Sequence, residues 1–255
     1  MKNSISIIVP IYNEELRLND FFIEIKNLSN YLNDFSLVEL IFVDDGSNDN
    51  SVKLLEEANF GQLNKIILKE HHVGMMNAIF AGIRKASTQN IITIEVDVPI
   101  KINEVVICLK KFLENKYDLL VGSRYLEIKP KNVPFIRKIV SKSYLYLFNQ
   151  YFNIKISDPQ IGFKIFKKDK FNLIYNFLNI KYDGLKSSQL IILFYMFGFN
   201  IVEISVQYEY KDNSKNFNLK NFLNVIFINI ISFFNLVNEI KKIKNNNKKL
   251  NNPFK

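Results

Sequence analysis

The stretch Ile91-Ile92-Thr93-Ile94-Glu95-Val96-Asp97 is typical of a short buried β-strand that ends in two acidic residues, Glu95 and Asp97. Side chains at positions i and i+2 of a strand lie on the same face, so both carboxylates can converge on one ligand at the carboxyl end of the strand. Because two unpaired carboxylates at that place repel each other, a divalent cation is their natural partner. A cation held in this way could bridge the phosphates of a nucleotide.

Strands and helices alternate on both sides of this stretch. Apolar runs separated by helical patterns of about ten to fifteen residues predict βαβ units and a mostly parallel sheet in an α/β fold. The near-continuous apolar character of the runs suits a sheet that helices cover on both faces. The expected strands are 4–9, 37–43, 65–68, 91–95 and 118–122, and the expected helices begin near Asn13 and span 51–59, 75–86 and 102–114.

Polar side chains follow most of the expected strands. In a parallel sheet the carboxyl ends of the strands meet at one edge, and ligands bind beyond that edge. The sequence therefore predicts a binding site there, formed by 10–14, 44–47, 95–97 and 123–124. The sequence contains no dinucleotide-binding glycine fingerprint, no phosphate-binding P-loop and no Gly-x-Ser-x-Gly nucleophile motif, which argues against those three chemistries.

Composition and charge narrow the class of protein. With 255 residues and 48% hydrophobic content, the chain can bury one substantial core. Cys108 is the single cysteine, which excludes a disulfide framework and fits a reducing compartment. The net charge of +9 is concentrated toward the asparagine- and lysine-rich segment 241–255, which we expect to be a disordered tail. Because no nucleic-acid-binding motif accompanies the charge, an anionic membrane is a better expected partner than nucleic acid.

Several motifs occur in a fixed order along residues 4–215. They are Ile8-Val9-Pro10-Ile11-Tyr12-Asn13-Glu14, Val43-Asp44-Asp45-Gly46-Ser47, Gly74 with Asn77-Ala78 and Ala81-Gly82, the Glu95-x-Asp97 pair, Val121-Gly122-Ser123-Arg124-Tyr125, and Asp158-Pro159-Gln160-Ile161-Gly162-Phe163-Lys164-Ile165-Phe166. With this ordered set the chain resembles the family 2 glycosyltransferases of GT-A fold. Within that family it is most similar to polyprenyl-phosphate sugar transferases of the dolichyl-phosphate mannose and bactoprenol glucosyl type.

The resemblance implies roles for individual residues in three groups. The base and ribose of a nucleoside-diphosphate sugar would contact Pro10, Tyr12, Glu14, Asp44 or Asp45, and Gly74. Mg²⁺ or Mn²⁺ on the diphosphate would be held by Asp97 with Glu95. The donor diphosphate and the acceptor phosphate would meet Arg124 and Arg137, with Lys164 and Lys215 as further acceptor-phosphate ligands. The bidentate fork of arginine suits phosphate oxygens.

The chain departs from the family pattern at several positions. The family usually has Asp-x-Asp where this chain has Glu95, and a glutamine of the lipid-phosphate branch is replaced by Pro99. An acid of the helix before the last strand aligns with Gln189, and an Asn-x-Gly motif reads His72-Val73-Gly74. Glutamate remains an oxygen ligand, whereas proline has no ligating side chain. The resemblance to the family is therefore stronger than the evidence for the metal site.

The nature of the acceptor depends on its acidity. A sugar hydroxyl is protonated at neutral pH and needs a carboxylate base, whereas a polyprenyl phosphate is already ionised and needs cations. Gln189 favours the phosphate, but Asp158 leaves both options open, as a base or as a group that orients Arg137 or Lys164. We expect an inverting transferase that moves a sugar from UDP or GDP to a polyprenyl phosphate in cell-envelope glycan synthesis. The alternatives are transfer to a sugar hydroxyl in capsule or surface glycan assembly, and a degenerate nucleotide-sugar-binding scaffold.

The segment 217–237 has an apolar and a polar helical face. Its polar residues are too many for a membrane span, so an interfacial helix is expected, on the inner membrane surface at the cytoplasmic face of the cell membrane. A dimer interface is the alternative use of its apolar face. The expected domains are thus a GT-A domain at 1–213, an interfacial helix at 214–240 and the tail at 241–255. The sugar, the base and the oligomeric state stay open.

Overall fold

A computed structural model describes residues 4–28, 31–32, 35–96, 100–127, 135–178, 185–207 and 219–254. In the helix Phe135–Tyr151 the side chains are described from residue 138 onward, and in the helix Leu219–Asn246 from residue 230 onward. Asp97, Pro99 and Lys215 lie outside the described residues, as does the side chain of Arg137.

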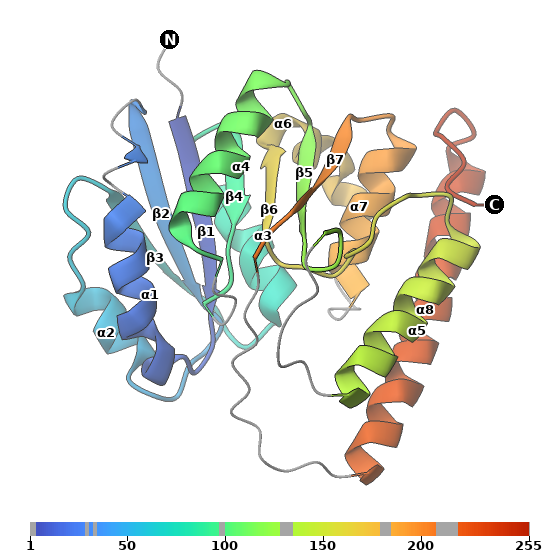
Figure 1. Cartoon of the computed structure of the whole chain (residues 1–255), viewed down its shortest axis with the longest axis horizontal. Coiled ribbons are helices and arrows are strands. Elements are labelled where there is room, and N and C mark those ends of the chain that lie inside the picture. The colour runs from blue at the N-terminus through green and yellow to red at the C-terminus, as the bar shows by residue number, and fades with distance from the viewer. Residues whose placement is uncertain are drawn as a thin grey trace.

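The centre of the molecule is one seven-stranded sheet with the order β3-β2-β1-β4-β6-β5-β7 (Figure 1). All neighbouring strands are parallel except β6, which runs antiparallel to both β4 and β5. This arrangement confirms the predicted α/β fold with a mostly parallel sheet. The strands are β1 Ser4–Ile11, β2 Leu37–Asp44, β3 Asn64–Lys69, β4 Asn90–Thr93, β5 Leu119–Ser123, β6 Lys164–Lys167 and β7 Ile201–Ser205.

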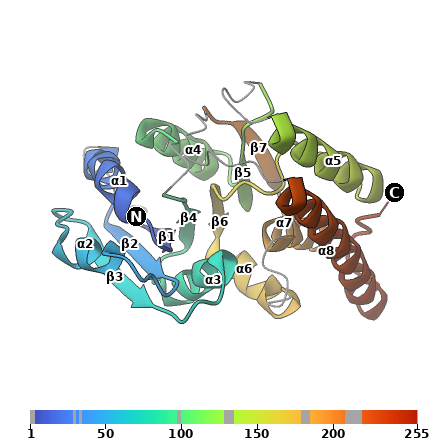
Figure 2. The ribbon, with the colours of Figure 1, turned by 90° about the horizontal axis from the view of Figure 1, so that it is seen from below.

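Helices cover both faces of the sheet. Figure 2 shows α1 and α4 on one face and α3, α6 and α7 on the other, with α5 and α8 packed beside one another at the β7 end. Because both faces are covered, β1 and β2 are buried at nearly every position, and most of their residues are apolar. The helices are α1 Glu15–Leu28, α2 Ser51–Glu57, α3 Met75–Lys85, α4 Ile102–Glu114, α5 Phe135–Tyr151, α6 Lys168–Ile174, α7 Lys186–Met196 and α8 Leu219–Asn246, with a 3₁₀ turn at Tyr175–Phe177.

The C-terminal segment differs from the sequence expectation. Helix α8 continues to Asn246, and the residues after it pack against the body of the molecule, so 241–254 is not a disordered tail. The backbone N–H of Asn251 donates to the carbonyl of Met196 at 2.8 Å, and that of Asn153 donates to the carbonyl of Pro253 at 2.9 Å. Composition alone suggested disorder, but the segment carries an aromatic residue that finds an apolar partner, since the ring of Phe254 lies 5.6 Å from that of Phe152.

Candidate active site

The predicted site edge exists in the structure as the carboxyl end of the parallel strands. Ile11 at the end of β1 is paired in register with Asp44 at the end of β2, and β4 follows β1 on the other side. On the far side of β6, β5 ends at Ser123, directly before Arg124. Residues from distant parts of the sequence are thereby gathered along one edge.

The loops after β1 and β2 are tied to each other. The backbone N–H of Asn13 donates to the hydroxyl of Ser47 at 2.9 Å, and the side-chain oxygen of Asn13 accepts from the backbone N–H of Asn48 at 2.8 Å. Asn13 therefore links two loops instead of capping α1, and its φ of 54° lies in the left-handed region that asparagine tolerates. Glu14 donates its N–H to Ser51 and pairs its carboxylate with Arg17 at 2.7 Å.

The two acids at the end of β2 accept hydrogen bonds from backbone N–H groups. The buried carboxylate of Asp45 accepts from the N–H groups of Val73 and Gly74 at 2.7 and 3.0 Å, which fixes the entry into α3. Gly74 has a φ of 92°, a conformation in which glycine avoids the strain of a side chain. The carboxylate of Asp44 accepts from the N–H of Ser47 at 3.2 Å. Both acids thus shape the loops that surround the predicted nucleotide site.

Two aromatic rings lie at the open side of this region. The rings of Tyr12 and His72 stack with centroids 4.4 Å apart and an angle of 28° between their planes. The tyrosine is 43% exposed, and Nδ1 of His72 is 3.1 Å from a carboxylate oxygen of Asp45. A half-exposed aromatic pair of this kind offers a flat surface on which a nucleobase can stack. Pro10, by contrast, lies inside β1 opposite Val43.

Glu95 lies just beyond the last residue of β4, against the backbone of Gly162. A methyl group on Gly162 would overlap the carboxyl group of Glu95. Among the described residues no group of three or more histidine, cysteine, aspartate or glutamate side chains could hold a metal. Mg²⁺ is commonly bound by one or two carboxylates together with substrate phosphates. The carboxylate of Glu95 is a ligand of the type that such a site uses, and its predicted partner Asp97 lies outside the described residues.

Lys164 faces the protein interior. Its side chain is 3% exposed, and its ammonium donates to the carbonyl of Ile161 and, at 2.7 Å, to the hydroxyl of Ser187. Burial lowers the pKa of Lys164 to about 8, while the charges of Glu95 and Asp158 counteract that shift. Lys164, which was expected to bind the acceptor phosphate, therefore donates its hydrogen bonds in this structure to Ile161 and to Ser187 at the start of α7.

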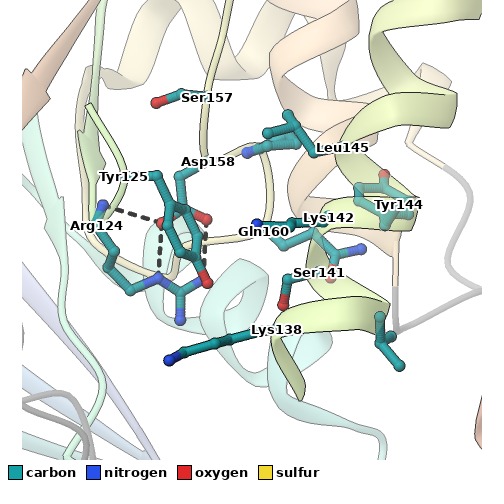
Figure 3. A pocket seen from close by; sticks show the side chains of 12 residues that line it. Arg124, Tyr125, Lys138, Ser141, Lys142, Tyr144, Leu145, Ser157, Asp158 and Gln160 are labelled. Atoms are coloured by element: carbon teal, nitrogen blue, oxygen red, sulfur yellow. Dashed lines mark hydrogen bonds and ion pairs between the residues drawn. The ribbon is translucent and has the colours of Figure 1, made fainter. Parts of the chain in front are cut away.

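Arg124 and Asp158 form a bidentate pair (Figure 3). Nε of Arg124 donates to Oδ2 of Asp158 at 2.6 Å, Nη2 donates to Oδ1 at 2.8 Å, and the backbone N–H of Arg124 donates to Oδ2 at 3.1 Å. Asp158 is 3% exposed, so this fork–fork contact is largely shielded from water. Both oxygens of Asp158 accept hydrogen bonds from Arg124, and the charge of Asp158 also acts on Lys164. The expected contact with Arg137 involves a side chain outside the described part of the chain.

A pocket of about 130 Å³ opens beside this pair, between the β5 end and α5. Its lining combines three cationic side chains, Arg124, Lys138 and Lys142, with one acid, Asp158. Ser141, Tyr125, Tyr144 and Gln160 contribute polar groups (Figure 3). The sequence reasoning missed the residues from α5, although two lysines four positions apart on a helix share one face and could have indicated the pocket.

Comparisons with known proteins identify the family of the chain. The sequence profile of glycosyl transferase family 2 matches residues 6–174. A dolichol-phosphate mannosyltransferase of Pyrococcus furiosus is 32% identical over 54% of this chain and 38% of its own length. A dolichyl-phosphate beta-glucosyltransferase of Trichomonas vaginalis is 29% identical over 83% of this chain and 67% of its own length. The match thus spans well under half of the Pyrococcus protein and about two thirds of the Trichomonas protein.

Solved structures show the same fold at low sequence identity. Glucosyl-3-phosphoglycerate synthase from Mycobacterium tuberculosis, in a complex with Mn²⁺, UDP and glucosyl-3-phosphoglycerate, superposes with a TM-score of 0.66 at 13% identity, over 92% of this chain and 80% of the synthase. S. aureus TarS in complex with UDP superposes with a TM-score of 0.55 at 17% identity, over 91% of this chain and 66% of the TarS chain. The profile match, the relatives and the shared fold confirm the resemblance found in the sequence: the chain belongs to glycosyl transferase family 2 and has a GT-A fold.

Proposed function

We propose that the protein transfers a sugar from a nucleoside-diphosphate sugar, with UDP or GDP as the leaving group, to a polyprenyl phosphate, with inversion at the anomeric carbon. The observation that carries the choice of acceptor is the bidentate contact between Arg124 and Asp158 at the cationic pocket. A setting in cell-envelope glycan synthesis follows from that acceptor, because polyprenyl phosphates carry sugars at membranes.

The chemistry of the pocket suits an acceptor that is already ionised. Asp158 is the one acid among the described residues that line it, and both of its oxygens accept hydrogen bonds from Arg124. A carboxylate engaged in this way is a poor base for a sugar hydroxyl. A phosphate monoester needs no base, and Arg124, Lys138 and Lys142 supply the positive charge that attracts it.

The donor would lie along the carboxyl edge of the sheet. The stacked rings of Tyr12 and His72 offer a surface for the base, and the loops held by Asp44 and Asp45 enclose the ribose. When bound, Mg²⁺ or Mn²⁺ on Glu95 and Asp97 would supply positive charge to the diphosphate. Both ions accompany UDP in structures of the mycobacterial synthase, which supports the assignment.

The reaction is a direct displacement. An oxygen of the acceptor phosphate forms a bond to the anomeric carbon as the bond from that carbon to the diphosphate oxygen breaks. The nucleoside diphosphate leaves with the electron pair, and attack from the opposite side inverts the configuration. Arg124 follows the end of β5 and lines the cationic pocket. From there its cation would stabilise the negative charge that develops on the leaving group.

The α5–α8 pair supports peripheral binding to the cytoplasmic face of the membrane. Phe233, Leu236 and Val237 of α8 are buried against the body of the molecule. Ile230, Ile231 and Phe234, on the adjoining part of the helix surface, are between 41 and 48% exposed. Lysines follow in the last turns of α8, and each contributes about 1 kcal/mol near an anionic leaflet. None of the helices in the described ranges is long and apolar enough to span a membrane.

A panel of nucleotide sugars tests the proposed activity. Full-length protein is incubated with radiolabelled UDP- and GDP-sugars, Mg²⁺ or Mn²⁺, and a short-chain polyprenyl phosphate or a free glycan. We expect label in the organic phase, a loss of at least a hundredfold for Arg124→Ala, and no loss for the matched variant Arg84→Ala, because Arg84 lies at the exposed end of α3. Label only in the aqueous glycan would contradict the phosphate acceptor, and donor binding without any transfer would favour a scaffold.

A flotation assay tests the membrane surface. The protein is mixed with vesicles of phosphatidylcholine alone or with about a third of phosphatidylglycerol. We expect binding to the anionic vesicles only, reduced severalfold by Phe234→Ser and unchanged by the matched variant Ile107→Ser on the exposed face of α4. Equal flotation of wild type and Phe234→Ser would contradict the assignment of this surface.

A further inference from the structure

We propose that Glu203 on β7 is a positioning residue for Arg124, which it orients through the turn at Ser157 and Asp158. The inference rests on the proposed function only in taking Arg124 as the phosphate-binding cation. Glu203 lies on the far strand of the sheet from the nucleotide loops and does not line the pocket. Any effect on catalysis must therefore pass through other residues.

The carboxylate of Glu203 gathers the hydrogen-bond donors of one turn. Its Oε1 accepts from the backbone N–H of Ser157 at 2.8 Å, from the hydroxyl of Ser157 at 2.8 Å, and from the backbone N–H of Asp158 at 3.0 Å. Its Oε2 accepts from the N–H of Ser157 at 3.0 Å. Two successive backbone N–H groups directed at one carboxylate fix the orientation of the peptide between them, and with it the position of the Asp158 side chain.

The same turn is joined to the strand that carries the arginine. The hydroxyls of Ser157 and Ser123 are 2.6 Å apart, and the Ser123 hydroxyl accepts from the N–H of Tyr125 at 3.2 Å. Glu203 is paired in register with Val121 of β5, two residues before Ser123. The carboxylate of Glu203 thus contacts the turn at Ser157 directly, and the Ser157 hydroxyl links it to Ser123, the residue before Arg124.

The last contact in this path is the bidentate pair itself. Asp158 accepts from Nε, Nη2 and the backbone N–H of Arg124, which leaves the guanidinium plane little freedom. A shift of about 1 Å in a positioning group can cost about a hundredfold in rate. Glu203 fixes the turn, the turn fixes Asp158, and Asp158 fixes Arg124.

The energetics favour a role in orientation. Burial raises the pKa of Glu203, and the hydrogen bonds from Ser157, Asp158 and Ser123 oppose that rise. Removing a carboxylate from water costs free energy, and the hydrogen bonds of Glu203 largely offset that cost. An apolar residue at this position would have no such cost, so the net contribution of Glu203 to stability is small. Its specific contribution is the geometry that it imposes on the turn.

The first arm of the test needs no activity. Arg17, Arg84, Arg124 and Arg137 are the arginines of the chain, so the Nε–Hε signals of full-length protein can be assigned with Arg124→Lys. We expect the Arg124 signal to be protected from exchange in wild type and to lose at least tenfold of that protection in Glu203→Ala. Glu203→Gln keeps one acceptor oxygen for the two N–H groups and should be intermediate. Unchanged protection in Glu203→Ala would overturn the proposal.

The matched control is Ser205→Ala on the same strand. Residues 203 and 205 project from the same face of β7, and the hydroxyl of Ser205 has no hydrogen-bond partner among the described residues. This variant should leave both the Arg124 signal and the activity at wild-type levels. A loss as large as that of Glu203→Ala would mean that any change in β7 perturbs the site, and would overturn the specific role of Glu203.

The second arm is a double-mutant cycle on kcat/KM. We expect Glu203→Ala to lower kcat/KM by about tenfold to a hundredfold in the wild-type background and by less than threefold in the Arg124→Lys background. A purely structural defect would lower activity equally in both backgrounds and would overturn the proposal. Full activity of Arg124→Lys and Arg124→Ala would instead contradict the proposed function, while the signal of Arg124 would still report the link to Glu203.

Discussion

At the scale of single residues, the acids at the site edge have different structural roles, although all of them were predicted from the sequence to be site residues. Asp45 and Asp158 are buried. Asp45 accepts a hydrogen bond from the backbone of the loop at Val73, and Asp158 accepts from the guanidinium of Arg124. Glu95 lies against the backbone of Gly162, and its charge acts on the buried ammonium of Lys164. These differences come from the partner that folding brings to each carboxylate, and they determine which substitutions affect chemistry and which affect shape.

Gly162→Ala should displace the Glu95 carboxylate at a small cost in stability. The added methyl group would overlap the end of a flexible side chain, which can rotate away. We expect the Mg²⁺ concentration for half-maximal transfer to rise severalfold, as in Glu95→Gln, while the melting temperature stays within a few degrees of wild type. A metal titration with thermal unfolding as control measures both, and an unchanged titration would contradict the placement of Glu95.

Glu39 predicts a pH dependence that is separate from the site. Its carboxylate is 4% exposed and accepts from the hydroxyls of Ser6 and Ser87 at 2.5 and 2.7 Å and from the N–H of Ser87 at 2.9 Å. Burial would raise its pKa, but these hydrogen bonds together with the charge of Lys168 outweigh burial and lower the pKa below 4.5. The folded state therefore binds the proton less readily than the unfolded state does.

The sign of this effect is that Glu39 contributes stability above pH 4.5, which is lost as the pH falls through the lowered pKa. We expect Glu39→Gln to lower the free energy of unfolding by about 1–3 kcal/mol at pH 7 and by less near pH 3. Urea unfolding at several pH values measures the difference, with the exposed Glu24→Gln as the control. A difference that does not change with pH would contradict the argument.

At the scale of elements, periodicity predicted the helices and strands that apolar residues define. Helix α4 has the predicted bounds of 102–114, because its apolar residues recur on one face and pack on the sheet. Strand β6 was not predicted. It has four residues, it begins and ends with lysine, and its antiparallel place between β4 and β5 depends on long-range pairing that no local pattern contains.

The places of some candidate site residues in the sheet were also predictable. The rule that ligands bind at the carboxyl edge of a parallel sheet is enough to place Asp44, Asp45, Glu95 and Arg124 from the sequence alone. The partners of these groups were not predictable, because the hydrogen bonds join residues 28 positions apart for Asp45 and Val73 and 34 apart for Arg124 and Asp158. Glu203, whose bond to Ser157 spans 46 positions, was not among the predicted site residues.

Gly82 tests how closely α3 lies on the sheet. A Cβ at this position would come within 2.5 Å of Ile8 and 3.0 Å of Val43. Alanine favours a helix over glycine by about 1 kcal/mol, but the overlap with packed core atoms should outweigh that gain. We expect Gly82→Ala to lower the free energy of unfolding by about 1–3 kcal/mol. Ala81→Gly on the same helix calibrates the propensity, and a stabilised Gly82→Ala would contradict the close packing.

At the scale of the whole molecule, α5 and α8 form an extra layer beyond β7. Phe233 of α8 is fully buried among the rings of Tyr144, Tyr151 and Phe152 from α5 and the residue after it. This aromatic contact holds the pair of helices on the body of the enzyme. Among the described apolar side chains of α8, Phe233, Leu236 and Val237 therefore pack internally, whereas Ile230, Ile231 and Phe234 remain at the surface.

The C-terminal segment closes this layer, and its removal should weaken the whole domain. Truncation after Asn246 removes the hydrogen bonds that Asn251 and Pro253 make with Met196 and Asn153, together with the ring contact of Phe254. We expect truncation to lower the free energy of unfolding by about 2–4 kcal/mol, and Phe254→Ala to account for about half of that loss because its side chain is only partly buried.

Deletion of Lys255 alone is the matched control and should leave the unfolding transition unchanged. Chemical unfolding of the three variants measures the differences, and hydrogen exchange of the Asn251 amide reports on the segment directly. Slow exchange is expected because that amide donates to the carbonyl of Met196. Equal unfolding midpoints for all chain lengths, with rapid exchange at Asn251, would mean that the segment is disordered in solution, as its composition suggests.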